Sequence, residues 1–130
     1  QATPPSGVHE SLTGPLAQKG LRVLCYGAGT VAEIILKTMG DDLAAEVDFC
    51  TGLAEERGLE FLGHVLQGIS DITLGQYDLI LMTPLRIGEK LFHQLLEPGL
   101  PQDFQGRVMV VETRRKNDSR EIFGRDVAGR

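Results

Sequence analysis

The amino-acid sequence predicts an α/β domain in which helices flank a doubly wound, mostly parallel sheet in three layers. Apolar segments of strand length alternate along the chain with amphipathic segments of helical periodicity, which is typical of parallel sheets with helical crossovers. The first clear apolar segment ends in a glycine-rich turn with Gly27 and Gly29, as the first strand-to-helix turn of such a sheet does. At 130 residues, the chain has the length of one domain.

The first part of the chain is expected to form a lead-in and then a β-α-β unit. Residues 1–20 are rich in Pro, Gly, Ser and Thr, which predicts a flexible lead-in or linker. Residues 21–27 (LRVLCYG) are an apolar run that ends in glycine, as a buried parallel strand does. Residues 45–51 (AEVDFCT) have the same character, so two strands enclose the segment between them.

The segment between these strands has the pattern of a helix. Glu33 and Lys37 form an i,i+4 pair in the favourable order. Gly40 stands where a left-handed C-terminal cap is wanted. The predicted apolar face consists of residues at spacings of three and four: Val31, Ile34, Ile35 and Met39.

The middle of the chain is irregular and then strongly strand-like. Glycines interrupt residues 52–72, within which residues 61–68 fit a short strand or an extended excursion. Residues 76–83 (QYDLILMT) contain the clearest strand, with an apolar run suited to burial on both faces. Pro84 breaks this strand.

The remainder of the chain predicts a helix, a strand and a tail. Residues 86–99 (RIGEKLFHQLLEPG) have an amphipathic pattern, and the predicted apolar face holds Ile87, Leu91 and Leu95, with Phe92 beside them. The last strand is expected at 107–113 (RVMVVET), and 114–130 reads as a polar, basic tail. The predicted domain therefore spans 21–113.

Composition and charge exclude several classes of protein. Hydrophobic residues make up 42% and charged residues 24%, which suits a packed core rather than a disordered chain. No apolar run approaches the roughly 20 residues that cross a bilayer, so no membrane insertion is expected. Residues 112–130 hold six basic and four acidic side chains, whereas the preceding part holds seven and fourteen. An acidic body argues against nucleic-acid binding.

The two cysteines, Cys25 and Cys50, lie inside strand-like segments. They are too few for a disulfide framework, and their spacing fits no zinc motif. We expect buried, reduced thiols, which favours a cytoplasmic location.

The glycine turn is the main candidate for a binding site. Gly27 can adopt a positive φ for the turn, and Gly29 allows a phosphate to approach the backbone. The amides of Gly29, Thr30 and Val31 would be free at the helix N-terminus, where the helix dipole favours an anion. Residues Gly27, Ala28, Gly29, Thr30 and Val31 thus form a predicted phosphate site, unless the glycines only make a tight turn.

Other strand ends supply further candidate residues at the same edge of the sheet: Thr51, Thr83, Pro84 and Arg86. Arg86 could hold a phosphate or carboxylate, or be an exposed helix residue. Dinucleotide sites also use an acidic residue at the end of the second strand. Asp48 comes two residues too early for this role, which counts against NAD as the cofactor.

Catalytic machinery is not evident in the sequence. His9 falls in the lead-in, His64 in the excursion and His93 in the second helix. No nucleophile elbow, phosphate-loop lysine, metal cluster or carboxylate pair is present. The residues favour a binding module without catalytic activity of its own.

Four segments resemble a recurring bacterial module: VLCYGAGTVAEIILKTMG, EVDFCTG, FLGHVLQGISDI and YDLILMTP. The chain is similar here to the Rossmann-like N-terminal nucleotide-sugar-binding domain of sugar acyltransferases, and to that of CapD-type polysaccharide-biosynthesis proteins. Gly27 and Gly29 match the first motif of that module, Gly63 and Gly68 approximate the third, and Tyr77-Asp78 matches the fourth. The acidic turn of that module is replaced by Cys50-Thr51-Gly52. The resemblance implies a Rossmann-like fold and a nucleotide-sugar ligand.

Three hypotheses about function follow. The first is a module that binds a nucleotide, with a nucleotide-sugar as the implied ligand and its phosphate on residues 27–31. The second is a ligand-free interaction or scaffold domain, present as a homodimer or tethered inside a larger protein. The third is a fragment of an NAD(P)-dependent oxidoreductase.

Overall fold

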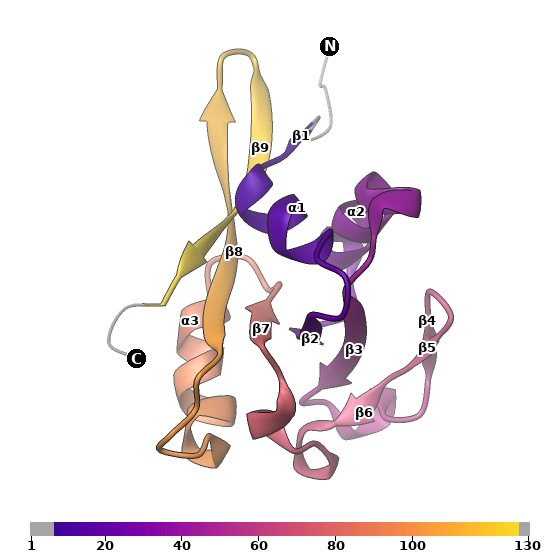
Figure 1. The fold of residues 1–130 in the computed structure, drawn as a ribbon, viewed down its shortest axis with the longest axis vertical. Helices are drawn as coiled ribbons and strands as arrows, with labels where there is room; N and C mark the ends of the chain where they lie inside the picture. Colours follow the sequence, from indigo (N-terminus) through magenta and orange to yellow (C-terminus); the bar gives the residue numbers. More distant parts are fainter. Residues whose placement is uncertain (1–6, 128–130) are drawn as a thin grey trace.

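A computed structural model of the chain describes residues 7–127, which form one continuous sheet with helices on both sides (Figure 1). The sheet has seven strands in the order β1-β9-β8-β7-β2-β3-β6. Their bounds are β1 Gly7–Val8, β2 Arg22–Tyr26, β3 Glu46–Thr51, β6 Gln67–Gly68, β7 Leu79–Met82, β8 Arg107–Lys116 and β9 Ser119–Asp126. The strands β6, β3, β2, β7 and β8 are mutually parallel. The prediction of a mostly parallel sheet is confirmed.

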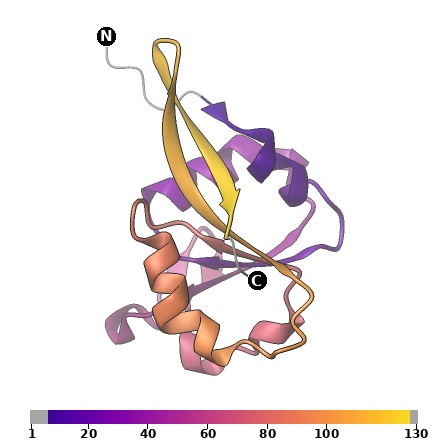
Figure 2. The ribbon, with the colours of Figure 1, turned by 90° about the vertical axis from the view of Figure 1, so that its left-hand side faces the viewer.

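Helices cover the two faces of this sheet (Figure 2). Helices α1 (Glu10–Leu16) and α2 (Thr30–Met39) pack on one face. Helix α3 (Gly88–Leu91) packs on the other and continues into a π-helical turn, η5 (Phe92–Leu96), and a 3₁₀ turn, η6 (Glu97–Gly99). Four more 3₁₀ turns connect strands and helices: η1 Gly40–Asp42, η2 Ala54–Glu56, η3 Ile69–Asp71 and η4 Leu74–Gln76. The layers are therefore helix, sheet and helix, as the alternation of patterns predicts.

Strand β2 shows why the central strands are apolar on both faces. Val23 and Cys25 point into the core beneath α1 and α2, whereas Leu24 and Tyr26 point into the core beneath α3. Successive side chains of a strand lie on opposite faces, so a strand covered on both sides needs a continuous apolar run. Strand β7 is buried at every position for the same reason.

The chain path reverses direction at β2. It leaves β2 for β3 and β6 on one side, then returns to place β7 and β8 on the other side. The segments that follow β2 and β7 therefore leave adjacent strand ends in opposite directions, at the carboxyl edge of the parallel strands. In open α/β sheets, this is where ligands bind.

Helix α2 agrees with most of its predicted pattern. Ile35 and Met39 are buried, as is Ala32, while Val31 and Ile34 are half-buried at the edge of the face. The predicted pair forms, with Lys37 Nζ 2.7 Å from Glu33 Oε2. Gly40 caps the helix with a positive φ of 51°, and its N–H donates to the Leu36 carbonyl.

The flexible lead-in predicted for residues 1–20 is wrong over the part that the structure describes, residues 7–20. Strand β1 pairs with β9, and Leu12 and Leu16 of α1 are each only 1% exposed. His9 caps α1 by accepting the N–H of Ser11 at 3.0 Å. The Ser11 hydroxyl oxygen in turn accepts the N–H of Gly124 at 2.8 Å, which ties α1 to β9. Residues 1–6 of the predicted lead-in lie outside the described residues.

The polar tail predicted for residues 114–130 is also wrong as far as Val127, where the described part ends. Strand β8 continues to Lys116, turns at Asn117 with φ 57°, and pairs with the antiparallel β9. The resulting hairpin projects beyond the rest of the sheet (Figure 1). Charge pairing stabilises this polar ribbon, because Arg114 lies 2.8 Å from the carboxylate of Glu121.

The second helix presents a face that differs in part from the one predicted, since Leu91 packs against the core as expected but Ile87 and Leu95 do not. Ile87 and Leu95 are 50% and 41% exposed, whereas Phe92 and Leu96 are fully buried. Gly88 explains the change, because a Cβ at this position would come within 3.3 Å of the Met82 Cβ. The missing side chain lets α3 approach the sheet closely, so the face of Gly88, Phe92 and Leu96 turns inward.

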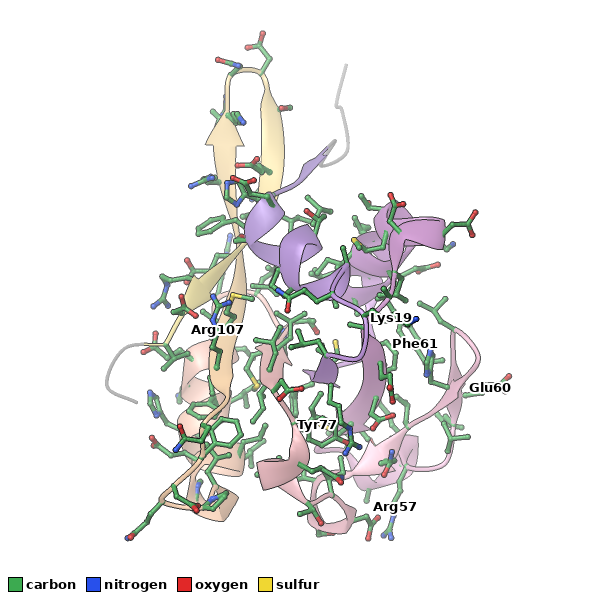
Figure 3. All side chains as sticks on the ribbon, in the orientation of Figure 1. Lys19, Arg57, Glu60, Phe61, Tyr77 and Arg107 are labelled. Carbon is green, nitrogen blue, oxygen red and sulfur yellow. The ribbon has the colours of Figure 1, made fainter. Side chains whose placement is uncertain are left out.

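A small hairpin stands between β3 and β6 in place of a helix. Strands β4 (Glu60–Phe61) and β5 (His64–Val65) are antiparallel. Phe61 reaches from this hairpin toward β3 (Figure 3). The rings of Phe61 and His64 both pack edge-on against the Phe49 ring, with 5.1 Å between ring centroids in each pair. No helix within residues 7–127 combines the length and apolar character needed to cross a membrane.

Candidate functional site

The glycine turn after β2 is held rigidly by the neighbouring strands. Gly27 adopts the predicted positive φ, at 100°, and its N–H donates to the Cys50 carbonyl at 3.0 Å. The Thr83 hydroxyl donates to the Tyr26 carbonyl at 2.8 Å, and the Thr83 N–H donates to the same oxygen at 3.1 Å. A Cβ on residue 27 would lie 2.5 Å from the Thr83 hydroxyl oxygen. Only glycine fits this turn, both by conformation and by space.

The N-terminus of α2 opens beside this turn. Gly29 is the N-cap residue, and within the described chain no side chain caps the helix. The first intrahelical bond runs from the Glu33 N–H to the Gly29 carbonyl, so the earlier amides of the first turn have no helical acceptor. A Cβ on Gly29 would face open space, since no described atom lies within 4 Å of it. Amides and helix dipole together favour an anion at this position.

Six of the predicted site residues line one depression of about 320 Å³, which we call the glycine-turn depression. Leu85 completes its lining, and the predicted members are Gly27, Gly29, Thr30, Val31, Thr83 and Pro84. Ala28 is not among them, because it packs against the core beneath α1 and α2. The depression offers backbone amides and the exposed Thr30, while the Thr83 hydroxyl is already engaged with Tyr26.

Thr51 lies apart from this depression. It lines a separate one of about 300 Å³ at the ends of β3 and β6. Its hydroxyl donates to Glu56 Oε1 at 2.8 Å and accepts the N–H of Leu53 at 3.0 Å. The Glu56 carboxylate therefore lies near the end of β3. The sequence does not predict an acidic residue there, because Glu56 comes five residues after Thr51 and is brought back by the loop.

Arg86 also lies outside the glycine-turn depression, but directly beside it. It lines a polar depression of about 540 Å³ together with Leu85, Glu112, Thr113 and Arg120, which we call the arginine depression. Leu85 lines both depressions. Arg86 is exposed and precedes α3 by two residues, with φ 71°. Arg120 belongs to the basic stretch TRRKNDSR, which the sequence allows as a small anion-binding patch or a solvated tail, but its place beside Arg86 follows only from the hairpin.

Asp48 is engaged inside the fold and does not reach the ligand edge. Its carboxylate accepts a 2.7 Å hydrogen bond from the Tyr77 hydroxyl. Burial, followed by this hydrogen bond, raises the pKa of Tyr77. Asp48 is therefore misplaced for holding a ribose, as its position in the sequence predicts.

The two cysteines are buried and free, as predicted. Burial raises the pKa of Cys50 from its ordinary value of 9.0 to about 12. Burial also raises the pKa of Cys25, and the neighbouring Cys50 adds to this effect. Both thiols are therefore protonated at neutral pH and poor nucleophiles.

The histidines occupy three different structural settings. His9 caps α1, and His64 packs on Phe49. His93 Nδ1 lies 2.9 Å from Glu97 and Nε2 lies 3.7 Å from Glu89. The hydrogen bond to Glu97 is the main cause that raises the pKa of His93. In the described part of the chain, no cluster of His, Cys, Asp and Glu could hold a metal ion.

Comparisons with known proteins found no relative. No protein-family model matches the chain, and no curated protein or solved structure matches it significantly.

Proposed function

We propose that the chain is a Rossmann-like module that binds a nucleotide, with a phosphate of the ligand on the Gly27–Val31 turn. One observation carries the proposal. The first turn of α2 has no side-chain cap among the described residues, and Gly29 directs its missing Cβ toward open space. A phosphate there would accept hydrogen bonds from the free amide N–H groups and meet the positive end of the helix dipole.

The sheet topology supports a nucleotide rather than an isolated anion. The five parallel strands have the order β6-β3-β2-β7-β8, which corresponds to 3-2-1-4-5 when they are numbered along the chain. Sheets of this order bind nucleotides across the ends of the first and fourth strands. Here those strands are β2 and β7, and the glycine-turn depression lies between their ends.

A nucleotide-sugar is the ligand class that we put first, because the sequence motifs resemble those of nucleotide-sugar-binding modules. The cytoplasmic location and the attachment to a larger protein are part of the same proposal. The glycine-turn depression supplies backbone donors but no described histidine or cysteine, so binding without catalysis is the simplest role for it.

Binding can be measured by isothermal titration of the full chain with UDP-glucose, UDP-N-acetylglucosamine, NAD(H) and NADP(H). NAD(H) belongs in this panel because the Glu56 carboxylate lies near the end of β3, where an acid can bind ribose hydroxyls. We expect saturable binding of one nucleotide class, and loss of it in Gly29→Arg, whose side chain would fill the phosphate position. Equal and weak responses to all nucleotides, unchanged in Gly29→Arg, would rule the proposal out.

An interaction domain is the second candidate, and exposed apolar residues favour it. Leu53, Ile87 and Leu95 are each at least 41% exposed. Leu95 lies beside the turn that precedes Leu53, since a Cβ on Gly52 would be 3.4 Å from Leu95 Cδ1. Light scattering decides this candidate: a stable dimer that Leu95→Lys dissociates, with no nucleotide binding, would support it over the first.

A further inference from the structure

The arginine depression lies on the same edge of the sheet as the glycine turn. One side is formed by Leu85 and Arg86, in the segment that follows β7. The other side is formed by the hairpin of β8 and β9, beyond the point where β7 stops pairing with β8 at Val110. Since Leu85 lines both depressions, a single extended ligand could occupy the two together.

Two guanidinium groups in this depression have donors to spare. Arg86 has no hydrogen bond or ion pair with any residue in the described range 7–127. Arg120 uses one of its five donors, through a 2.8 Å hydrogen bond from Nη2 to the Thr113 hydroxyl. Guanidinium groups pair well with planar oxyanions such as carboxylates, and also with phosphates.

The acidic residue in the depression is already hydrogen-bonded to another partner. Glu112 Oε2 accepts hydrogen bonds from Arg125 at 2.9 and 3.1 Å. Arg125 also donates to Glu89 at 2.8 Å, and His93 lies 3.7 Å from Glu89. The Glu112 carboxylate is therefore turned to Arg125, which leaves Arg86 and Arg120 to face the depression.

The surrounding backbone and charges favour an anion between these two side chains. Arg86 has φ 71°, a conformation that costs energy for a residue with a side chain and that concentrates at functional sites. Arg120 stands directly opposite Arg115 in the hairpin, and like charges at opposed positions destabilise a strand pair. An anion bound to Arg120 would relieve this repulsion.

We propose that the arginine depression is a second anion subsite, which binds a carboxylate or phosphate at the far end of the same nucleotide ligand. The inference rests on the proposed function and narrows its ligand class to nucleotides with an acidic distal group. A nucleoside diphosphate uronic acid has this character: its diphosphate fits the glycine turn, and its sugar carboxylate reaches Arg86 and Arg120.

The test compares two ligands of almost equal size, UDP-glucuronic acid and UDP-glucose, by isothermal titration with the full chain. One charge-assisted contact supports a preference of about tenfold for the acidic sugar. UDP-galacturonic acid and UDP-glucose 6-phosphate then distinguish a carboxylate from a phosphate as the recognised group. Salt weakens the preference if ion pairing causes it.

Variants locate the source of the preference. Arg86→Gln and Arg120→Gln are expected to abolish it while UDP-glucose binds as before. Arg107→Gln is the control, because it removes the same charge from the opposite end of β8, outside the depression, and it should leave the preference intact. Arg86→Gly adds an independent readout, since glycine suits φ 71°: we expect a higher melting temperature together with loss of the preference.

The outcomes separate the two proposals. If UDP-glucose and UDP-glucuronic acid bind equally, or if both arginine variants keep the preference, the second subsite is wrong and the nucleotide site stands. If neither ligand binds the wild-type chain, the proposed function fails, and this inference fails with it.

Discussion

Thr83 and Gly27 are packed so closely that residue 27 has no room for a side chain. A Cβ there would lie 2.5 Å from the Thr83 hydroxyl oxygen, which is itself fixed by its hydrogen bond to the Tyr26 carbonyl. The ends of β2 and β7 are thereby locked together at the point where their following segments diverge. Rigid elements of this kind position a binding site well, because the amides at the turn are held in place before a ligand arrives.

The two glycines of the turn should respond differently to substitution. Gly27→Ala combines a positive φ of 100° with the contact to Thr83, so we expect a loss of about 2–4 kcal/mol in the free energy of unfolding. Gly29→Ala introduces a Cβ into open space at a negative φ, and should change stability by less than about 1 kcal/mol. Urea denaturation of both variants checks this contrast, and equal stabilities would contradict it.

Helix α1 should behave as an integral part of the core. Leu12→Ala removes a side chain that is 1% exposed, and we expect a loss of about 2–4 kcal/mol in the free energy of unfolding. The matched control is Gln18→Ala, at an exposed position just beyond the same helix, which should be within about 0.5 kcal/mol of the wild type. If urea denaturation shows no change in the free energy of unfolding for Leu12→Ala, this segment is a lead-in that does not contribute to the core.

The hydrogen bond between Tyr77 and Asp48 should contribute measurably to stability. Tyr77→Phe leaves the half-buried Asp48 carboxylate without its 2.7 Å donor, and should cost about 1–3 kcal/mol. A double-mutant cycle with Asp48→Ala isolates the pairwise contribution. Additive effects of the two substitutions would show that the two side chains are not coupled.

The thiols predict a loss of stability at alkaline pH. Burial raises the pKa of Cys50 from 9.0 to about 12 and also raises that of Cys25, so the folded state keeps protons that the unfolded chain releases. The stabilising effect is complete below pH 9 and is lost as the pH rises from 9 toward 12. We expect the free energy of unfolding to fall by about 1–3 kcal/mol between pH 8 and pH 10.

Thiol chemistry and a variant separate this effect from other alkaline changes. The native protein should react slowly with a thiol reagent at pH 8, and both cysteines should react at once in denaturant. In a Cys25→Ala/Cys50→Ala variant, the free energy of unfolding should lose most of its dependence on pH between pH 8 and pH 10. Tyr77, whose pKa is raised from its ordinary value of 10.0, still adds a dependence at higher pH. An unchanged pH profile in the double variant would exclude the thiols as its cause.

The sequence predicted the central β-α-β unit because several independent signals coincide there. The apolar run of β2, the helical spacing through Met39 and the glycines at both ends of α2 all point to the same elements. The prediction of a lead-in is wrong because Gly14 and Pro15 are typical of linkers, although docking of Leu12 and Leu16 stabilises the short helix. Tertiary packing overrides local composition in such a segment.

The sequence predicts the candidate site at the glycine turn and at the end of the neighbouring strand, but not beyond them. Residues 27–31 form a turn whose chemistry follows from adjacent residues, and Thr83 and Pro84 join it because neighbouring parallel strands end at one edge. Arg120 and Glu56 reach their positions through a hairpin return and a folded-back loop. Long-range placements of this kind have no periodic signature in the sequence.

The amide resonances of Gly29, Thr30 and Val31 provide the most direct test of the central claim. We would record ¹H–¹⁵N spectra of the full chain during titration with UDP-glucuronic acid. Our account predicts saturable shifts that are largest at these three amides, with none at Gly106, which precedes β8 at the opposite, amino edge of the parallel strands. Small shifts scattered over the surface, with none at the first turn of α2, would show that the glycine turn serves the fold alone.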